Sequence, residues 1–112
     1  MSNYYEITLD QGATFAATIE LKDYFTNESI NLVGYIARSQ LRKNYDSTTS
    51  NNFTVSNQDA AKGNISMSMT ASNTANLKPG RYVYDLEIEE TSSSEVTRVL
   101  QGVAIVTPQV TR

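Results

Sequence analysis

The sequence contains no cysteine and no histidine among its 112 residues. Without cysteine there can be no disulfide and no thiol catalysis, and without histidine there can be no Ser-His-Asp triad. Together the two absences exclude nearly every zinc or transition-metal site, so we expect no cofactor and no metal. No run approaches the ~18–20 apolar residues of a membrane span, and the N-terminal stretch lacks the basic and apolar regions of a signal peptide.

Neither sign of charge is in large excess, because the formal net charge is only −3. Lysine and arginine are scattered singly, and the nearest approach to a basic patch is Arg38, Arg42 and Lys43. This distribution argues against nucleic-acid binding. Hydrophobic residues make up 39% of the chain. That share suits a single thin, two-layer β-domain over residues 1–112, with polar outer faces.

The most regular stretch is "LKPGRYVYDLEIEE", residues 77–90, where a proline-glycine turn leads into an alternating pattern. A period of two predicts a strand with one buried and one solvated face. The apolar positions are Tyr82, Tyr84, Leu86 and Ile88, and the polar positions are mostly Arg81, Asp85, Glu87 and Glu89.

Similar patterns predict strands near 4–12, 13–23, 35–45, 53–56, 65–70 and 96–107, with one helical turn near 71–77. We therefore expect an all-β fold, an immunoglobulin-like antiparallel β-sandwich of about seven strands. Ile30 and Leu32 are expected to anchor a loop, and the polar segment 46–52 to be mobile or ordered only by a neighbour. The predicted buried residues are Phe15, Ile19, Leu21, Ile65, Met67, Tyr84, Leu86 and Ile88.

The passage "NLKPGRYVYDL" resembles the corner of a fibronectin type III domain, where a tyrosine ties the turn to nearby backbone. The spacing from Leu77 to Tyr82 is one residue shorter than that family's usual pattern. This difference argues against a corner role for Tyr82.

A wider resemblance runs over nearly the whole chain, through "EITLDQGATFAATIELKD", "GYIARSQLRK", "GNISMSMTASNTANLKPGRYVYDLEIE" and "VTRVLQGVAIVTPQVTR". These segments resemble small virion structural proteins of tailed phages, particularly marine myophages. They are more distantly similar to the N-terminal β-sandwich domain of upper baseplate proteins. The resemblance implies a virion part made in the host cytoplasm, tail or baseplate associated, present in many copies and bound to other virion proteins.

No constellation of residues points to catalysis, so we expect no enzyme. Asp85, Glu87, Glu89 and Glu90 could form a cation site or a hydrolytic pair, but an acidic outer face explains them more simply. "NQDAAKGN", residues 57–64, is a weak candidate for a calcium loop.

The last predicted strand is apolar on both faces, with Val99, Val103 and Ile105 on one side and Leu100, Ala104 and Val106 on the other. A bulge at Gln101-Gly102 would turn Leu100, Val103 and Ile105 inward. Val99, Ala104 and Val106 would still face outward and form a partner interface. On this hypothesis Val99→Asp or Val106→Asp leaves the domain folded and weakens its assembly.

The function favoured by the sequence is therefore a non-catalytic structural and assembly module of a virion. The alternatives are a glycan-binding host-attachment module, suggested by seven tyrosines on a polar β-domain, and a capsid decoration protein.

Overall fold

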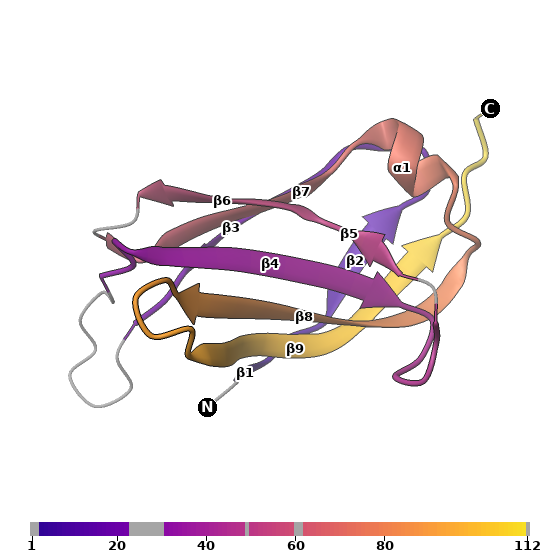
Figure 1. The fold of residues 1–112 in the computed structure, drawn as a ribbon. Helices are drawn as coiled ribbons and strands as arrows, with labels where there is room; N and C mark the ends of the chain where they lie inside the picture. The colour runs from indigo at the N-terminus through magenta and orange to yellow at the C-terminus, as the bar shows by residue number, and fades with distance from the viewer. Residues whose placement is uncertain (1–2, 23–30, 49, 60–61, 112) are drawn as a thin grey trace.

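The structure, a computed structural model, describes residues 3–22, 31–48, 50–59 and 62–111. These residues form nine β-strands and one α-helix (Figure 1). No helix in these ranges is long and apolar enough to cross a membrane. The predicted anchor Ile30 lies outside the described residues, whereas Leu32 is fully buried, as predicted.

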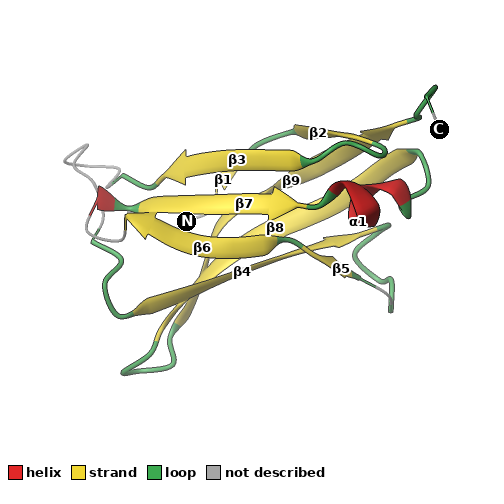
Figure 2. Cartoon of the chain, turned by 90° about the horizontal axis from the view of Figure 1, so that it is seen from above, coloured by secondary structure: helices red, strands yellow, loops and turns green. Residues whose placement is uncertain are grey.

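The smaller sheet has three strands, β3 (Phe15–Glu20), β7 (Asn64–Met69) and β6 (Thr54–Asp59), all antiparallel with β7 in the centre (Figure 2). Its strands follow the alternation in the sequence. Ile65, Met67 and Met69 are buried, while Ser66 and Ser68 between them are partly exposed.

The larger sheet has the order β1-β9-β8-β4-β5, and β2 also pairs with β9. Its strands are β1 (Asn3–Tyr4), β2 (Ile7–Asp10), β4 (Tyr35–Arg42), β5 (Asn51–Asn52), β8 (Gly80–Glu90) and β9 (Val96–Thr107). Strands β1 and β2 run parallel to β9, so this sheet is mixed rather than wholly antiparallel. The two sheets pack face to face, which makes the fold the expected immunoglobulin-like β-sandwich (Figure 1).

The core lies between the sheets and takes residues from both. Six of the eight residues predicted as buried are buried. Phe15 and Ile19 are only half-buried, because β3 pairs with β7 alone among the described strands and lies at the edge of its sheet. The buried hydrophobic residues with the lowest exposure are Leu9, Leu32, Leu41, Ile65, Met67, Leu86, Ala104 and Val106.

Helix α1 (Ala71–Ala75) connects the two sheets and begins where the Thr70 side chain accepts a hydrogen bond from Asn73 N. After its end, the Tyr82 hydroxyl donates to Lys78 O at 2.7 Å. This is the backbone tie of a tyrosine corner. The expectation drawn from the short spacing was therefore wrong: a span of four residues is enough to close the corner.

Strand β9 contains a bulge, but not at the predicted glycine. Leu86 pairs with Leu100 and Glu87 pairs with Arg98, so Val99 is the extra residue. Gly102 serves another purpose: a Cβ atom there would lie 2.0 Å from Tyr5 O. The same carbonyl oxygen accepts a hydrogen bond of 2.6 Å from the Tyr84 hydroxyl. Gly102 and Tyr84 thus seat the backbone between β1 and β2 on the sheet.

Part of the polar segment 46–52 is ordered by pairing. Asn51 and Asn52 form β5 against Leu41 and Gln40. The predicted mobility of the rest of this segment stays a prediction, and residue 49 lies outside the described part of the chain.

Candidate functional site

The solvent side of the larger sheet, called the outer face below, carries side chains that the fold does not use in its core. Strand alternation and register place them in rows across β4, β8 and β9. The outer face consists of Ile36, Arg38, Gln40 and Arg42 on β4, Arg81, Val83, Asp85, Glu87 and Glu89 on β8, and Val96, Arg98, Gln101, Val103 and Ile105 on β9.

Ion pairs cross the outer face between neighbouring strands. Arg38 contacts Glu87 at 3.2 Å and Glu89 at 2.8 Å, and Arg98 contacts Asp85 at 3.5 Å. Burial, and then the charge of Glu87, raise the pKa of the Asp85 carboxyl, while three arginines oppose the rise. Since solvated ion pairs contribute only about 0–1 kcal/mol to folding, this network has little value for stability.

Three acidic residues of β8, Asp85, Glu87 and Glu89, pair with arginine. Among the described residues no group of three or more Asp or Glu could hold a metal ion. Glu90 accepts hydrogen bonds from Ser93, Tyr35 and Ser92, and these lower the pKa of its carboxyl. The segment 57–64 lies partly outside the described residues, so its calcium hypothesis is not addressed.

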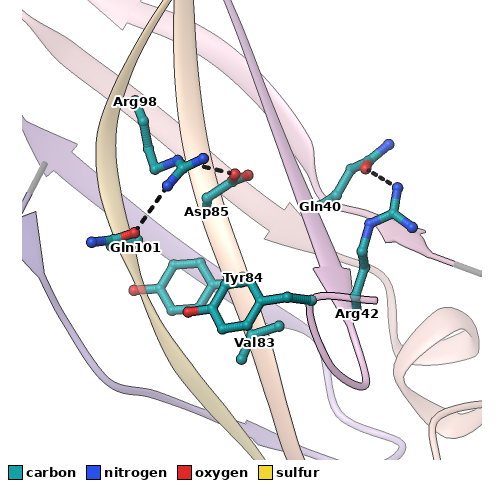
Figure 3. A pocket seen from close by; sticks show the side chains of 8 residues that line it. Gln40, Arg42, Val83, Tyr84, Asp85, Arg98 and Gln101 are labelled. Atoms are coloured by element: carbon teal, nitrogen blue, oxygen red, sulfur yellow. Dashed lines mark hydrogen bonds and ion pairs between the residues drawn. The ribbon is translucent and has the colours of Figure 1, made fainter. Parts of the chain in front are cut away.

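A hollow of about 170 Å³ opens in the middle of the outer face (Figure 3). Arg98 donates to the Gln101 amide oxygen at 3.2 Å on one side, and Arg42 donates to the Gln40 amide oxygen at 3.1 Å on the other. The lining consists of Gln40, Arg42, Tyr45, Val83, Tyr84, Asp85, Arg98 and Gln101. Planar polar groups around an exposed tyrosine give this hollow the means to bind a polar ligand or a polar side chain of a partner.

Apolar side chains lie at both ends of the outer face. Val83 pairs with Val103, and Ile105 is next along β9 on the same side. Val103 is only 6% exposed, yet it does not belong to the core cluster. At the other end, Ile36 and Val96 flank Glu89 and are 50% and 46% exposed.

Two tyrosines add to this surface. Tyr4 pairs with Gln101 in β1, which puts it beside the central row of the outer face, and it is 67% exposed. Tyr45 borders the hollow and is 76% exposed. Of the large hydrophobic residues that the described chain exposes, four (Tyr4, Ile36, Tyr45 and Val96) therefore lie on or beside one face.

The predicted interface residues occupy other places. Ala104 and Val106 are fully buried in the core, with 0% and 2% exposure, and Val99 is half-buried against it. The bulge at Val99 is the physical reason, because one extra residue exchanges the two faces of the strand after it. Val103 and Ile105, expected inside, lie on the outer face instead. The interface hypothesis for Ala104 and Val106 is wrong.

A second hollow, of about 280 Å³, lies between the sheets near β3 and is mainly apolar. The half-buried rings and chains of Phe15 and Ile19 form one wall, and Tyr84 and Leu100 form the opposite one. Tyr5 stands at this hollow with 61% of its surface exposed. The residues described as lining this hollow are uncharged and mostly apolar, so the hollow suits a mainly apolar group.

No protein-family model matches this sequence, and no curated protein matches it. Among solved structures, the chain is similar to Listeria monocytogenes InlP, with a TM-score of 0.53 and 20% identity over 95% of this chain. It spans 28% of the InlP chain. A second similar structure is the NK cell receptor Nkp44, described as a triggering partner in natural cytotoxicity. Its TM-score is 0.48 at 13% identity, over 96% of this chain and 99% of that chain. At these identities the likeness concerns the fold alone.

Proposed function

We propose that this protein is a non-catalytic structural and assembly component of a tailed-phage virion, associated with the tail or baseplate, and that it binds neighbouring virion proteins through its outer face. The observation that carries the docking role is the gathering of exposed apolar side chains with charged residues on that one face. The virion is inferred from the resemblance of the sequence to phage structural proteins.

The physical argument for a docking role is that the outer face contributes little to the stability of the fold. Exposed Ile36 and Val96 and the covered Val103 add no area to the core, and the ion pairs beside them stabilise the fold only weakly. Ile36 and Val96, on either side of Glu89, are the exposed apolar groups of this face, and an exposed apolar patch favours an interaction site. Charged neighbours supply the specificity and the orientation of such a contact.

The test begins with purified particles of the source phage. Mass spectrometry should find this chain in them, and its absence would refute a virion role. A sharper step complements the phage with Ile36→Asp, which should lower the number of copies per particle. Ala16→Asp, an exposed position on the smaller sheet, is the matched control and should leave the copy number unchanged.

A second candidate, host attachment through a glycan, is favoured by the hollow in the outer face. Its amide, guanidinium and carboxylate groups beside exposed Tyr45 are suited to sugar hydroxyls. A saccharide titration followed by tyrosine fluorescence separates the two functions. Saturable binding that is lost in Tyr45→Ala would favour attachment, and no change at millimolar sugar would exclude it.

A further inference from the structure

A third hollow, of about 400 Å³, opens at the end of the sandwich where β4 ends and β8 begins. Helix α1 and strand β5 lie at the same end (Figure 1 and Figure 2). Three of the residues that line it are basic: Arg42, Lys43 and Lys78. No acidic side chain is among the described residues of its lining, so it is called the basic hollow below. Arg42 and Lys43 come from the end of β4 and Lys78 precedes β8, so only the fold brings them together.

The three cations of the basic hollow have no carboxylate partner among the described residues. The ion pairs of the described chain involve other basic residues, which are Lys22, Arg38 and Arg98. Arg42 donates to two neutral acceptors, Ser47 O at 2.6 Å and the Gln40 amide oxygen at 3.1 Å. The chain has twelve acidic residues and a net charge of −3, yet none of these acids neutralises this group of cations. Their mutual repulsion opposes folding, and a bound anion would relieve it.

The ammonium group of Lys43 is positioned by its neighbours. It lies 4.8 Å from the centroid of the Tyr82 ring, a cation–π contact that needs the charged form of the lysine. A Cβ atom on Gly80 would lie 2.9 Å from this ammonium group, so the glycine leaves the space that the group occupies. The Tyr82 hydroxyl donates to Lys78 O, which ties the ring to the turn that carries the second lysine. One cation of the hollow is therefore in place before a ligand arrives, which lowers the cost of ordering it on binding.

The amides and the size of the basic hollow define its ligand further. Asn51 and Asn76 add two exposed side-chain amides to the lining. An amide both donates and accepts hydrogen bonds, so it suits a hydroxyl or carbonyl group of a ligand. The volume of about 400 Å³ falls within the ~300–1,000 Å³ that small-molecule sites enclose. Charge, hydrogen bonding and volume together suit a small polar anion.

We propose that the basic hollow binds a small organic anion that carries two or more oxyanion groups, either carboxylates or phosphates. The two ammonium groups and the guanidinium group bind the oxyanions through charge-assisted hydrogen bonds. Asn51 and Asn76 bind the neutral polar groups of the ligand. This function goes beyond docking in an assembly, because the basic hollow shares only Arg42 with the outer face.

Isothermal titration calorimetry of the purified chain tests the proposal with citrate, which carries three carboxylates, and fructose bisphosphate, which carries two phosphates. At least one of them should bind saturably to a single site with a Kd below about 1 mM, and glucose should not bind. Lys43→Gln and Lys78→Gln should each weaken this binding by about tenfold, because each removes a charge-assisted contact. Circular dichroism checks that both variants stay folded. The anion that binds more tightly identifies the oxyanion as carboxylate or phosphate.

Two variants that remove the same charge elsewhere are the matched controls. Lys62→Gln changes an exposed residue just before β7, at the end of that strand away from α1. Arg98→Gln changes the lining of the hollow in the outer face and leaves the lining of the basic hollow intact. Both should bind the anion as tightly as the unchanged chain does.

The absence of saturable binding by either anion would overturn the proposal, and so would heat that sodium chloride of equal ionic strength reproduces. A control variant that binds as weakly as Lys78→Gln would do the same. Tighter binding of a hexaglutamate peptide than of both small anions would replace the small ligand by an acidic protein segment. The proposed function is tested separately: a chain that is missing from particles but binds citrate refutes the virion role and leaves the basic hollow standing.

Discussion

Strand β8 presents two unlike faces to its surroundings. On the inner face Tyr82, Tyr84, Leu86 and Ile88 are all buried, with 7% exposure or less. On the outer face the side chains of Asp85, Glu87 and Glu89 alternate with them and contact arginines of β4 and β9. One alternating stretch of sequence therefore builds a core wall and a polar surface at once.

The difference between the two faces shows which of them stabilises the fold and which is available for contacts. Full burial of a large apolar side chain contributes roughly 1.5–3 kcal/mol, whereas an exposed ion pair contributes about 0–1 kcal/mol. Stability therefore comes from the inner face, and the outer face is free to vary in the service of contacts. Substitutions on the two faces should differ accordingly.

The largest effect is expected from Val106→Asp. Val106 is 2% exposed in the core, so a carboxylate there would lose most of its contact with water. We expect a loss of about 4 kcal/mol or more, enough to abolish the cooperative unfolding transition seen by circular dichroism. Ile105→Asp is the control, one residue away on the outer face beside Arg81, and should stay folded. If both variants fold equally well, the assignment of the two faces of β9 is wrong.

A smaller loss is expected from Gly102→Ala. The new Cβ would lie 2.0 Å from Tyr5 O, so the backbone between β1 and β2 must move away from the sheet. The free energy of unfolding from urea titration should fall by about 2–3 kcal/mol. Gly34→Ala, where nothing lies within 4 Å and only the positive φ opposes a side chain, should cost about 1 kcal/mol. Equal losses would show that the close approach at Gly102 is unimportant.

Tyr84→Phe removes the hydrogen bond to Tyr5 O and should cost about 1–2 kcal/mol. It should also change the response to alkali. Burial raises the pKa of the Tyr84 hydroxyl to about 12 from its ordinary 10.0. The folded chain therefore keeps this proton after the unfolded chain has lost it, and stability falls as pH rises from 10.0 towards 12. In the variant this part of the decline should disappear from melts measured across that range.

The smallest effect is expected on the outer face, from Glu87→Gln. The substitution breaks the 3.2 Å ion pair with Arg38 but leaves the 2.8 Å pair between Arg38 and Glu89. We expect the free energy of unfolding to change by less than about 0.5 kcal/mol. A loss above 1 kcal/mol would mean that the outer face does contribute to the fold, against the comparison drawn above.

Local alternation was sufficient to predict much of this fold. The period of two in β3, β7 and β8 arises because successive side chains point to opposite sides of a sheet. Neighbouring residues in the sequence are enough to show that alternation. The helical turn near 71–77 was also predicted from the sequence, because Pro79 and Gly80 follow it closely; the helix itself is Ala71–Ala75.

What the sequence could not predict depends on distance across the fold. A bulge at Val99 is invisible in β9 itself, since it arises from pairing with β8. Gly102 signalled an irregularity but not its kind, because a glycine allows either a bulge or a close backbone approach. The same limit applied to the candidate site. Its apolar residues on β9, Val103 and Ile105, were assigned to the wrong face by one residue of register, whereas the charged residues on β8 were placed correctly.

The pairing of β2 with β9 has a consequence for how the chain comes to its folded state. The hydrogen bond from Thr107 to Asp10 joins residues 97 positions apart, and Ile7 pairs with Ala104. During synthesis β2 must therefore wait until β9, which is 97 positions later at Thr107, has been made. Closing so long a loop is entropically costly, and such long-range pairing slows folding. Until β2 pairs with β9, the side chains of Leu9 and Val106 stay exposed to water, and the nascent chain is at its most prone to aggregation.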